Sequence, residues 1–230
     1  MSATQVKDAD ERILQTSALR KLLGRPELGS VVGAIAVFVF FAFFADSFLR
    51  ASSLSTVLYA ASTIGIMAVP VALLMIGGEF DLSAGVMVTS SALVSSMFSY
   101  QMTADVWVGV GVSLLVTLAI GAFNGFMLTR TKLPSFIITL GTFLMLTGMN
   151  LGFTKLIDGT VSTKSIEDME GFPSARDVFA STITVGGVGF KITILWWLAL
   201  VAVASWILLR TRAGNWIFAV GGNKDAARAV

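Results

Sequence analysis

Residues Gly77–Gly85 read GGEFDLSAG and place two carboxylates, Glu79 and Asp81, between two long runs without charge. The run before them covers 28 residues, 51–78, and the run after them covers 23 residues, 82–104. Each run is long enough for a helix that crosses a bilayer, which needs about 20 mainly apolar residues. The two acids are therefore catalytic groups, ligands of an ion, or only polar residues between two membrane spans.

Long uncharged runs continue through the rest of the chain. Hydrophobic residues make up 55% of its 230 residues and charged residues only 13%, whereas soluble domains carry about 25% charged residues. Cutting the sequence at its charged residues predicts an all-α, polytopic bundle of about six transmembrane helices, with Pro70 as a candidate kink. The expected spans lie near 28–45, 51–78, 82–104, 106–129, 133–154 and 192–209.

The placement of Lys and Arg predicts the orientation of these spans. Basic residues occur in the tail 1–27, in the connector Arg130–Lys132 and in the segment 210–230. Six spans put all three on one side, and an excess of Lys and Arg marks that side as cytoplasmic. The polar segment 158–191 is then an external loop, with a short helix expected around Ser165–Met169. The opening stretch falls on the cytoplasmic side, either as a turn or as a segment that re-enters the protein.

Composition excludes several functions. The chain has no Cys and no His, which removes thiol chemistry, disulfides, imidazole metal sites and Ser-His nucleophiles. The closest string to a nucleotide-binding loop, Gly186–Lys191, has the wrong spacing. We therefore expect a chain that is not an enzyme, that holds no cofactor or metal, that binds no nucleic acid and that depends on another protein for energy.

Two alternatives stay open on these residues. A self-sufficient channel or secondary transporter would need polar groups along a route through the spans, and few are visible. A membrane enzyme would need Glu79 and Asp81 to differ in pKa so that they could act as acid and base. Two acids at positions i and i+2 need not face one another on a helix, and no partner groups are evident.

A structural role explains most of the opening stretch. Gly77, Gly78 and Gly85 allow a sharp turn and a close approach of helices. Asp81 suits the first turn of the helix expected from Leu82, where the helix dipole favours an acid and a side-chain oxygen can cap backbone N–H groups. Ser83 is expected to share that capping, which leaves Glu79 as the less explained group.

The fourth expected span contains GAFNG, Gly121–Gly125, a spacing that lets helices approach closely. A buried amide near the end of a span, such as Asn124, is expected to bond a neighbouring helix, with a substrate contact as the other interpretation. The candidate residues for a translocation path or gate are Gly77, Gly78, Glu79, Asp81, Ser83 and Asn124.

The last 21 residues, Arg210–Val230, read RTRAGNWIFAVGGNKDAARAV. Gly221 and Gly222 are expected to break the chain, and Asn223 is a good N-cap for a short helix over 224–230 outside the membrane. Such a helix either docks in a groove of a cytoplasmic protein or lies on the surface without a partner.

Three separated motifs, in order, resemble one known family. GGEFDLSAG resembles the Gly/acid-Asp-Leu-Ser-x-Gly signature of bacterial ABC-type permeases for simple sugars, the ribose and xylose type. LPSFIITLGT, Leu133–Thr142, resembles the stretch that follows the fourth span in that family. The segment from Arg210 resembles its cytoplasmic loop of the form TR-x-G-x-x-x-x-A-x-GGN-x-x-A-A-R. The resemblance covers most of residues 55–230.

The resemblance implies a non-catalytic permease subunit of the bacterial plasma (inner) membrane. Two copies, as a homodimer, would form a path for a monosaccharide or related small polar solute. A separate cytoplasmic ATP-binding subunit would drive it, and an extracytoplasmic solute-binding protein would deliver the solute. Family members are expected to continue with several more spans, so a chain ending at Val230 is expected to be shortened. The implied ATPase-coupling residues are Gly214, Gly221, Gly222, Asn223, Ala226, Ala227 and Arg228.

Overall fold

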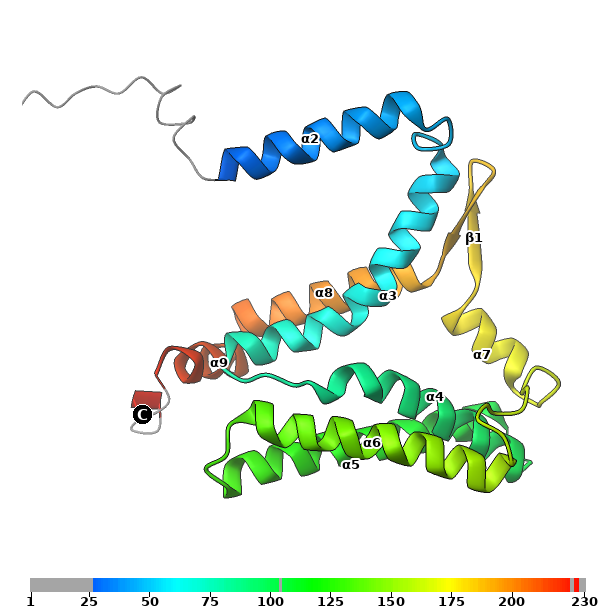
Figure 1. Ribbon diagram of the computed structural model, residues 1–230, viewed down its shortest axis with the longest axis vertical. Helices are drawn as coiled ribbons and strands as arrows, with labels where there is room; N and C mark the ends of the chain where they lie inside the picture. The colour runs from blue at the N-terminus through cyan, green and yellow to red at the C-terminus, as the bar shows by residue number, and fades with distance from the viewer. Residues whose placement is uncertain (1–26, 104, 224–225, 228–230) are drawn as a thin grey trace, which may run out of the picture. The chain divides into compact units, whose positions relative to one another are not determined.

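The computed structural model describes residues 27–103, 105–223 and 226–227. The tail predicted over 1–27 therefore lies outside the described residues, apart from the backbone of Glu27, with which the first helix begins. The chain divides into two compact units, 1–53 and 54–230, and each is described by itself. Figure 1 labels the elements along the chain.

The first unit contains one long apolar helix, α2 (Glu27–Phe44), and the turn that follows it. The chain folds back after α2, so that the ring of Phe48 packs against Phe38 and Phe41 with centroids 5.3 and 5.8 Å apart. Aromatic pairs at such distances are favourable, and they hold the turn against its own helix.

The second unit holds the remaining helices, and helices occupy all six segments predicted as spans. In this unit α4 packs lengthwise against both α5 and α6 (Figure 1). The helices are α3 (Ala51–Ile76), α4 (Ser83–Gln101), α5 (Val106–Arg130), α6 (Ser135–Asp158), α8 (Thr193–Arg210) and α9 (Arg212–Gly222).

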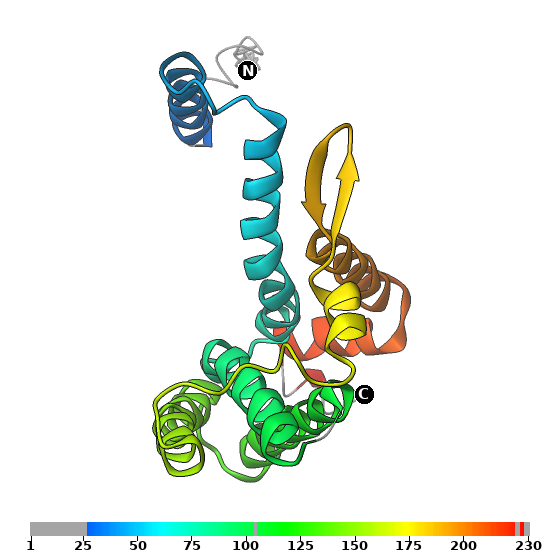
Figure 2. The ribbon, with the colours of Figure 1, turned by 90° about the vertical axis from the view of Figure 1, so that its right-hand side faces the viewer.

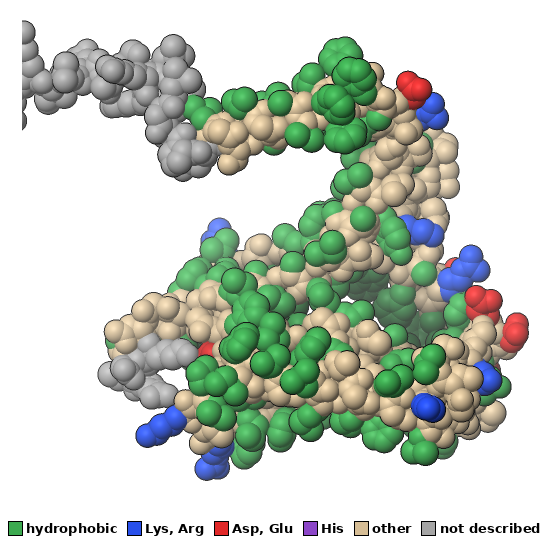
Figure 3. All heavy atoms as spheres, viewed as in Figure 1, with side chains coloured by type: hydrophobic (Ala, Val, Ile, Leu, Met, Phe, Trp, Pro, Cys, Tyr) green, Lys and Arg blue, Asp and Glu red, His purple; other side chains and the backbone are tan. Residues whose placement is uncertain are grey.

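Four of these helices, α3, α5, α6 and α8, are long and apolar enough to cross a membrane. The apolar stretch of α2 is shorter, and α4 carries six serines over 19 residues. In Figure 3 apolar side chains cover much of the visible helix surface, while charged side chains gather toward helix ends. A surface of this kind suits lipid rather than water.

Small residues allow the closest helix contacts. A Cβ added at Gly65 in α3 would overlap the indole of Trp197 in α8, so this glycine lets the two helices meet. Within α3, Pro70 has no N–H to donate to the carbonyl of Ile66. Figure 1 shows α3 bending along its length, as predicted from this proline.

The segment 158–191 corrects two predictions. Residues 167–170 form a turn instead of the helix expected around Ser165–Met169, and the helix of this segment is α7 (Phe172–Phe179). A hairpin of two strands, β1 (Thr182–Val185) and β2 (Val188–Lys191), follows α7 (Figure 2). The strands are antiparallel, with Thr182 opposite Lys191. The fold is therefore mostly helical rather than all-α.

Candidate functional site

The opening stretch begins as the C-terminal cap of α3. Gly78 has a φ of 78°, in the left-handed region that glycine adopts at low cost. Its N–H donates to the carbonyl of Met75, and the N–H of Glu79 donates to the carbonyl of Leu74, both at 3.0 Å. This pair of bonds is the Schellman arrangement, which satisfies carbonyls that a helix end leaves open. Gly78 thus ends α3 sharply.

Asp81 caps the next helix, as predicted. Its Oδ1 accepts hydrogen bonds from the backbone N–H of Ser83 at 2.7 Å and from the Ser83 hydroxyl at 2.6 Å. The carboxylate also lies at the N-terminus of α4, where the helix dipole favours negative charge. The prediction that Ser83 shares the capping is wrong, because its hydroxyl donates to Asp81 instead of accepting a backbone N–H.

A buried amide joins three helices around this cap. Asn124 of α5 donates from Nδ2 to the Ser83 hydroxyl oxygen at 3.1 Å, and its Oδ1 accepts from the hydroxyl of Thr142 in α6 at 2.6 Å. Ser83 has no exposed surface and Asn124 is 7% exposed, so both need internal partners. The prediction that Asn124 bonds neighbouring helices is confirmed.

The backbone between the two helices is tied to the start of α6. The N–H of Phe80 donates to the hydroxyl of Ser135, and the N–H of Leu82 donates to the hydroxyl of Thr139, both at 3.1 Å. The Thr139 hydroxyl in turn donates to the carbonyl of Ser135 at 2.9 Å. Two backbone donors outside regular structure are thereby satisfied by side chains.

Three hydroxyl groups of this site were not predicted from the sequence. Ser135, Thr139 and Thr142 are at positions i, i+4 and i+7, and therefore lie on one face of α6. Such a hydroxyl stripe at the start of an apolar helix is the signal that could have identified them. Asp81, Ser83 and Asn124, together with Thr139 and Thr142, form what we call the polar junction.

Asp81 lies at two hollows in the second unit. One is a pocket of about 230 Å³ that Asn124 and Thr139 also line. The other is a groove of about 680 Å³ between α3, α4 and α5. Its polar lining is Asp81 with Ser91, Ser113 and Thr117. Their hydroxyls donate to carbonyls of their own helices, so their oxygens remain available as acceptors.

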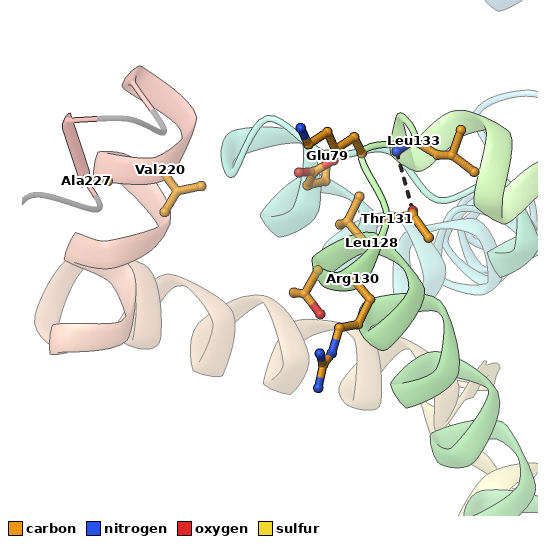
Figure 4. A pocket seen from close by; sticks show the side chains of 9 residues that line it. Glu79, Leu128, Arg130, Thr131, Leu133, Val220 and Ala227 are labelled. Carbon is orange, nitrogen blue, oxygen red and sulfur yellow. Dashed lines mark hydrogen bonds between the residues drawn. The ribbon is translucent and has the colours of Figure 1, made fainter.

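Glu79 faces a different hollow. It lines a pocket of about 640 Å³ together with Arg130 and Lys132 of the connector after α5, and with Val220 and Ala227 from the C-terminal segment. Figure 4 shows the labelled side chains contributed by these three parts of the chain. Glu79 and Asp81 both line the smaller pocket, and each also lines a larger hollow that the other does not reach.

Among the predicted coupling residues, Gly214 lies at the turn from α8 to α9. It is buried, and an added Cβ would overlap the carbonyl oxygen of Leu208. Its N–H donates to the hydroxyl of Thr211 at 3.3 Å, which caps α9. The glycine is what allows α9 to turn so closely against the end of α8.

The helix ends where the break at Gly221 and Gly222 was predicted, because these two glycines are the last residues of α9. The cap predicted for Asn223 is confirmed. Its Oδ1 accepts from the N–H of Ala226 at 3.0 Å, and its carbonyl accepts from the N–H of Ala227 at 3.0 Å. Arg228 lies outside the described residues.

The structure brings part of the predicted gate and part of the predicted coupling segment together. A Cβ added at Gly221 would overlap the carbonyl oxygen of Ile76, and a Cβ at Gly78 would lie 3.6 Å from the Cα of Gly221. Gly214 is at the other end of the same helix. Among the described residues no group of three or more acidic side chains is placed to hold a metal ion.

Comparison with known proteins identifies relatives of the chain. A family model described as the branched-chain amino acid transport system / permease component matches residues 53–230. The autoinducer 2 import system permease protein LsrD of Klebsiella pneumoniae is 31% identical over 166 residues, which are 72% of this chain and 47% of that protein. The ribose import permease protein RbsC of Escherichia coli K12 is 28% identical over 207 residues, 88% of this chain and 60% of that protein.

The fructose import permease protein FrcC of Rhizobium meliloti is 24% identical over 202 residues, 86% of this chain and 54% of that protein. The chain thus spans about half the length of the curated relatives it matches. No solved structure matches it. Because the family model covers most of the sequence, the chain belongs to this family of permease components, the multi-pass membrane subunits of bacterial ABC importers.

Proposed function

We propose that this chain forms part of the translocation path of an ATP-driven importer for a monosaccharide or related small polar solute. The observation that carries the proposal is the groove between α3, α4 and α5, whose apolar walls include hydroxyl acceptors and the carboxylate of Asp81. Apolar walls with a few convergent polar groups are typical of small-molecule sites. A polyhydroxylated solute can donate to these oxygens, as it donates to water.

The names of the relatives support the same class of solute. They are named for import of ribose, fructose, galactose or methyl galactoside, and autoinducer 2. All are small polar molecules, and the differences among them leave the individual solute undetermined. The absence of charge from the middle of the helices speaks against coupling to protons or voltage.

We further propose six spans, with α2 and α4 added to the four helices that qualify by length and composition. The serines of α4 do not exclude it, because α4 packs against α5 and α6 and three of the serines, Ser83, Ser90 and Ser99, are buried. Six spans put both ends of the chain on the cytoplasmic side, together with Arg130 and Lys132. Homodimerisation and delivery by an extracytoplasmic solute-binding protein belong to the same proposal.

A cytoplasmic ATPase is expected to co-purify with the chain through the segment 214–230. The double variant Gly222→Glu, Arg228→Glu places two acids on this segment and is expected to reduce capture of the ATPase at least tenfold, about 1.4 kcal/mol of binding free energy. The measurement is the amount of ATPase recovered with the tagged chain from solubilised membranes.

The matched control is Lys164→Glu, which changes charge in the same direction at an exposed position on the predicted external side. It is expected to leave capture unchanged. Equal capture by the double variant and the unaltered chain would show that the segment 214–230 is not the ATPase contact.

A further inference from the structure

We propose that Gly221 is a positioning residue, which joins α9 to the end of α3 so that the two move as one body. Movement of the ATPase contact would then reach the polar junction directly through the turn Gly77–Leu82. The inference rests on the proposed function and adds the route by which the ATPase acts on the groove.

The first observation is the contact itself. Gly221 lies so close to the carbonyl oxygen of Ile76 that any side chain there would overlap it. Ile76 is the last residue of α3, where helix carbonyls have no partner within the helix. A glycine Cα can approach such a carbonyl as a weak C–H donor, whereas alanine cannot fit.

Two further residues of α9, Ile217 and Val220, lie close to the turn that follows α3. A Cβ at Gly77 would lie 3.8 Å from Cγ2 of Ile217 in α9, which is ordinary van der Waals contact. Val220, beside Gly221, lines the same pocket as Glu79. The C-terminal half of α9, from Ile217 to Gly221, therefore lies along the turn that links α3 to α4.

The other end of α9 is held to α8. Thr211 donates its hydroxyl to the carbonyl of Ile207 at 2.6 Å and accepts from the N–H of Gly214. Gly214 fits against the carbonyl of Leu208 only because it has no side chain. α9 is therefore packed closely at both of its ends, and closely packed protein transmits strain.

Hydrogen bonds also hold the turn Gly77–Leu82 to α4 and α6. Phe80 and Leu82 bond α6 through Ser135 and Thr139, and Asp81 bonds the start of α4. A displacement of α9 therefore acts on the end of the groove at Asp81 without crossing an unpacked segment. Coupling of this kind needs a contiguous set of contacts with two arrangements.

The test is Gly221→Ala in membrane vesicles that contain the assembled transporter. Its control is Gly141→Ala, since Gly141 of α6 has nothing within 4 Å of an added Cβ. Alanine favours helix over glycine, so any loss at Gly221 comes from the contact. We expect ATP hydrolysis to continue and solute uptake per ATP to fall at least about fivefold, the lower end of coupling between distant sites.

Normal uptake per ATP in Gly221→Ala, or an equal loss in Gly141→Ala, would overturn the inference. Loss of ATPase capture in Gly221→Ala would also overturn it, because Gly221 would then touch the ATPase instead of α3. Absence of capture by the unaltered chain is a separate result, which refutes the proposed function and the inference with it.

A second measurement does not depend on the folding of Gly221→Ala. The chain has no cysteine, so the variant Gly77→Cys, Ile217→Cys carries one cysteine pair, at two positions that lie in van der Waals contact. We expect equal cross-linking in nucleotide-free and ATP-trapped transporter, because the two surfaces move together. Cross-linking in only one of these states would show that α9 separates from α3 during the cycle.

Discussion

Replacing Asp81 with alanine is expected to lower the free energy of unfolding by about 2–4 kcal/mol. About 1 kcal/mol comes from the lost helix cap, and about 1–3 kcal/mol comes from the buried Ser83 N–H and hydroxyl left without an acceptor. Both groups donate to the same oxygen, Oδ1 of Asp81, so one substitution removes both bonds. The measurement is thermal unfolding of the purified chain in lipid nanodiscs.

Three further variants are compared with Asp81→Ala in the same unfolding measurement. Asp81→Asn keeps an acceptor oxygen and loses the charge, so it is expected to fall between alanine and the unaltered chain. Asn124→Leu removes two interhelical bonds, which in membranes cost about 0.6 kcal/mol each. Glu79→Gln keeps the size of the side chain and one acceptor oxygen, so it is expected to lower stability less than Asp81→Ala does.

Loss of uptake without loss of stability in Asp81→Ala would show that Asp81 binds the solute instead of stabilising the fold. If Asp81→Ala unfolds at the temperature of the unaltered chain and yet abolishes uptake, its carboxylate acts in the pathway. If only Glu79→Gln abolishes uptake with assembly intact, the pathway includes the hollow at Arg130 and Lys132.

Gly109→Leu is expected to be the second strongly destabilising change. Gly109 is a buried residue of α5, and an added Cβ would overlap the hydroxyl of Ser99 and lie 2.5 Å from the carbonyl oxygen of Ser95, both in α4. A backbone carbonyl cannot rotate away, so the two helices must separate. Overpacking of this kind costs about 1–3 kcal/mol and occasionally more.

Gly111→Leu is the matched control, because Gly111 lies two residues along the same helix and has nothing within 4 Å of an added Cβ. The added leucine there is expected to leave the unfolding temperature within about 1 °C, a change of well under 0.5 kcal/mol. Equal behaviour of the two variants would contradict the close contact of α4 and α5 at Gly109.

The helices of this chain were predictable because bilayer thickness imposes a length on uncharged runs. The roles of polar residues at span ends were predictable where a side chain bonds backbone groups only a few residues away. Asp81 next to the start of α4 and Asn223 before Ala226 both behave as side-chain caps, which depend only on nearby backbone. Asn124 was predictable in kind, since a buried amide needs a partner, although its partners Ser83 and Thr142 were not.

The errors come from tertiary contacts and from an overlooked turn. α9 does end at Gly222, as helix propensity predicts, but the contact of Gly221 with Ile76, which the absence of a side chain permits, was not predicted. The hairpin was predictable from two consecutive glycines in the sequence. Gly186 and Gly187, with φ of 59° and 81°, form the two-residue connection that joins antiparallel strands.

Uptake of radiolabelled ribose, fructose and galactose into vesicles, with and without the co-reconstituted ATPase, tests the central claim most directly. The claim is that this chain provides a path and that ATP hydrolysis in a separate subunit drives it. Uptake of at least one of these sugars is expected only when ATPase and ATP are both present, with no uptake driven by a proton or sodium gradient alone. Gradient-driven uptake in vesicles without any ATPase would contradict the account and identify a self-sufficient transporter.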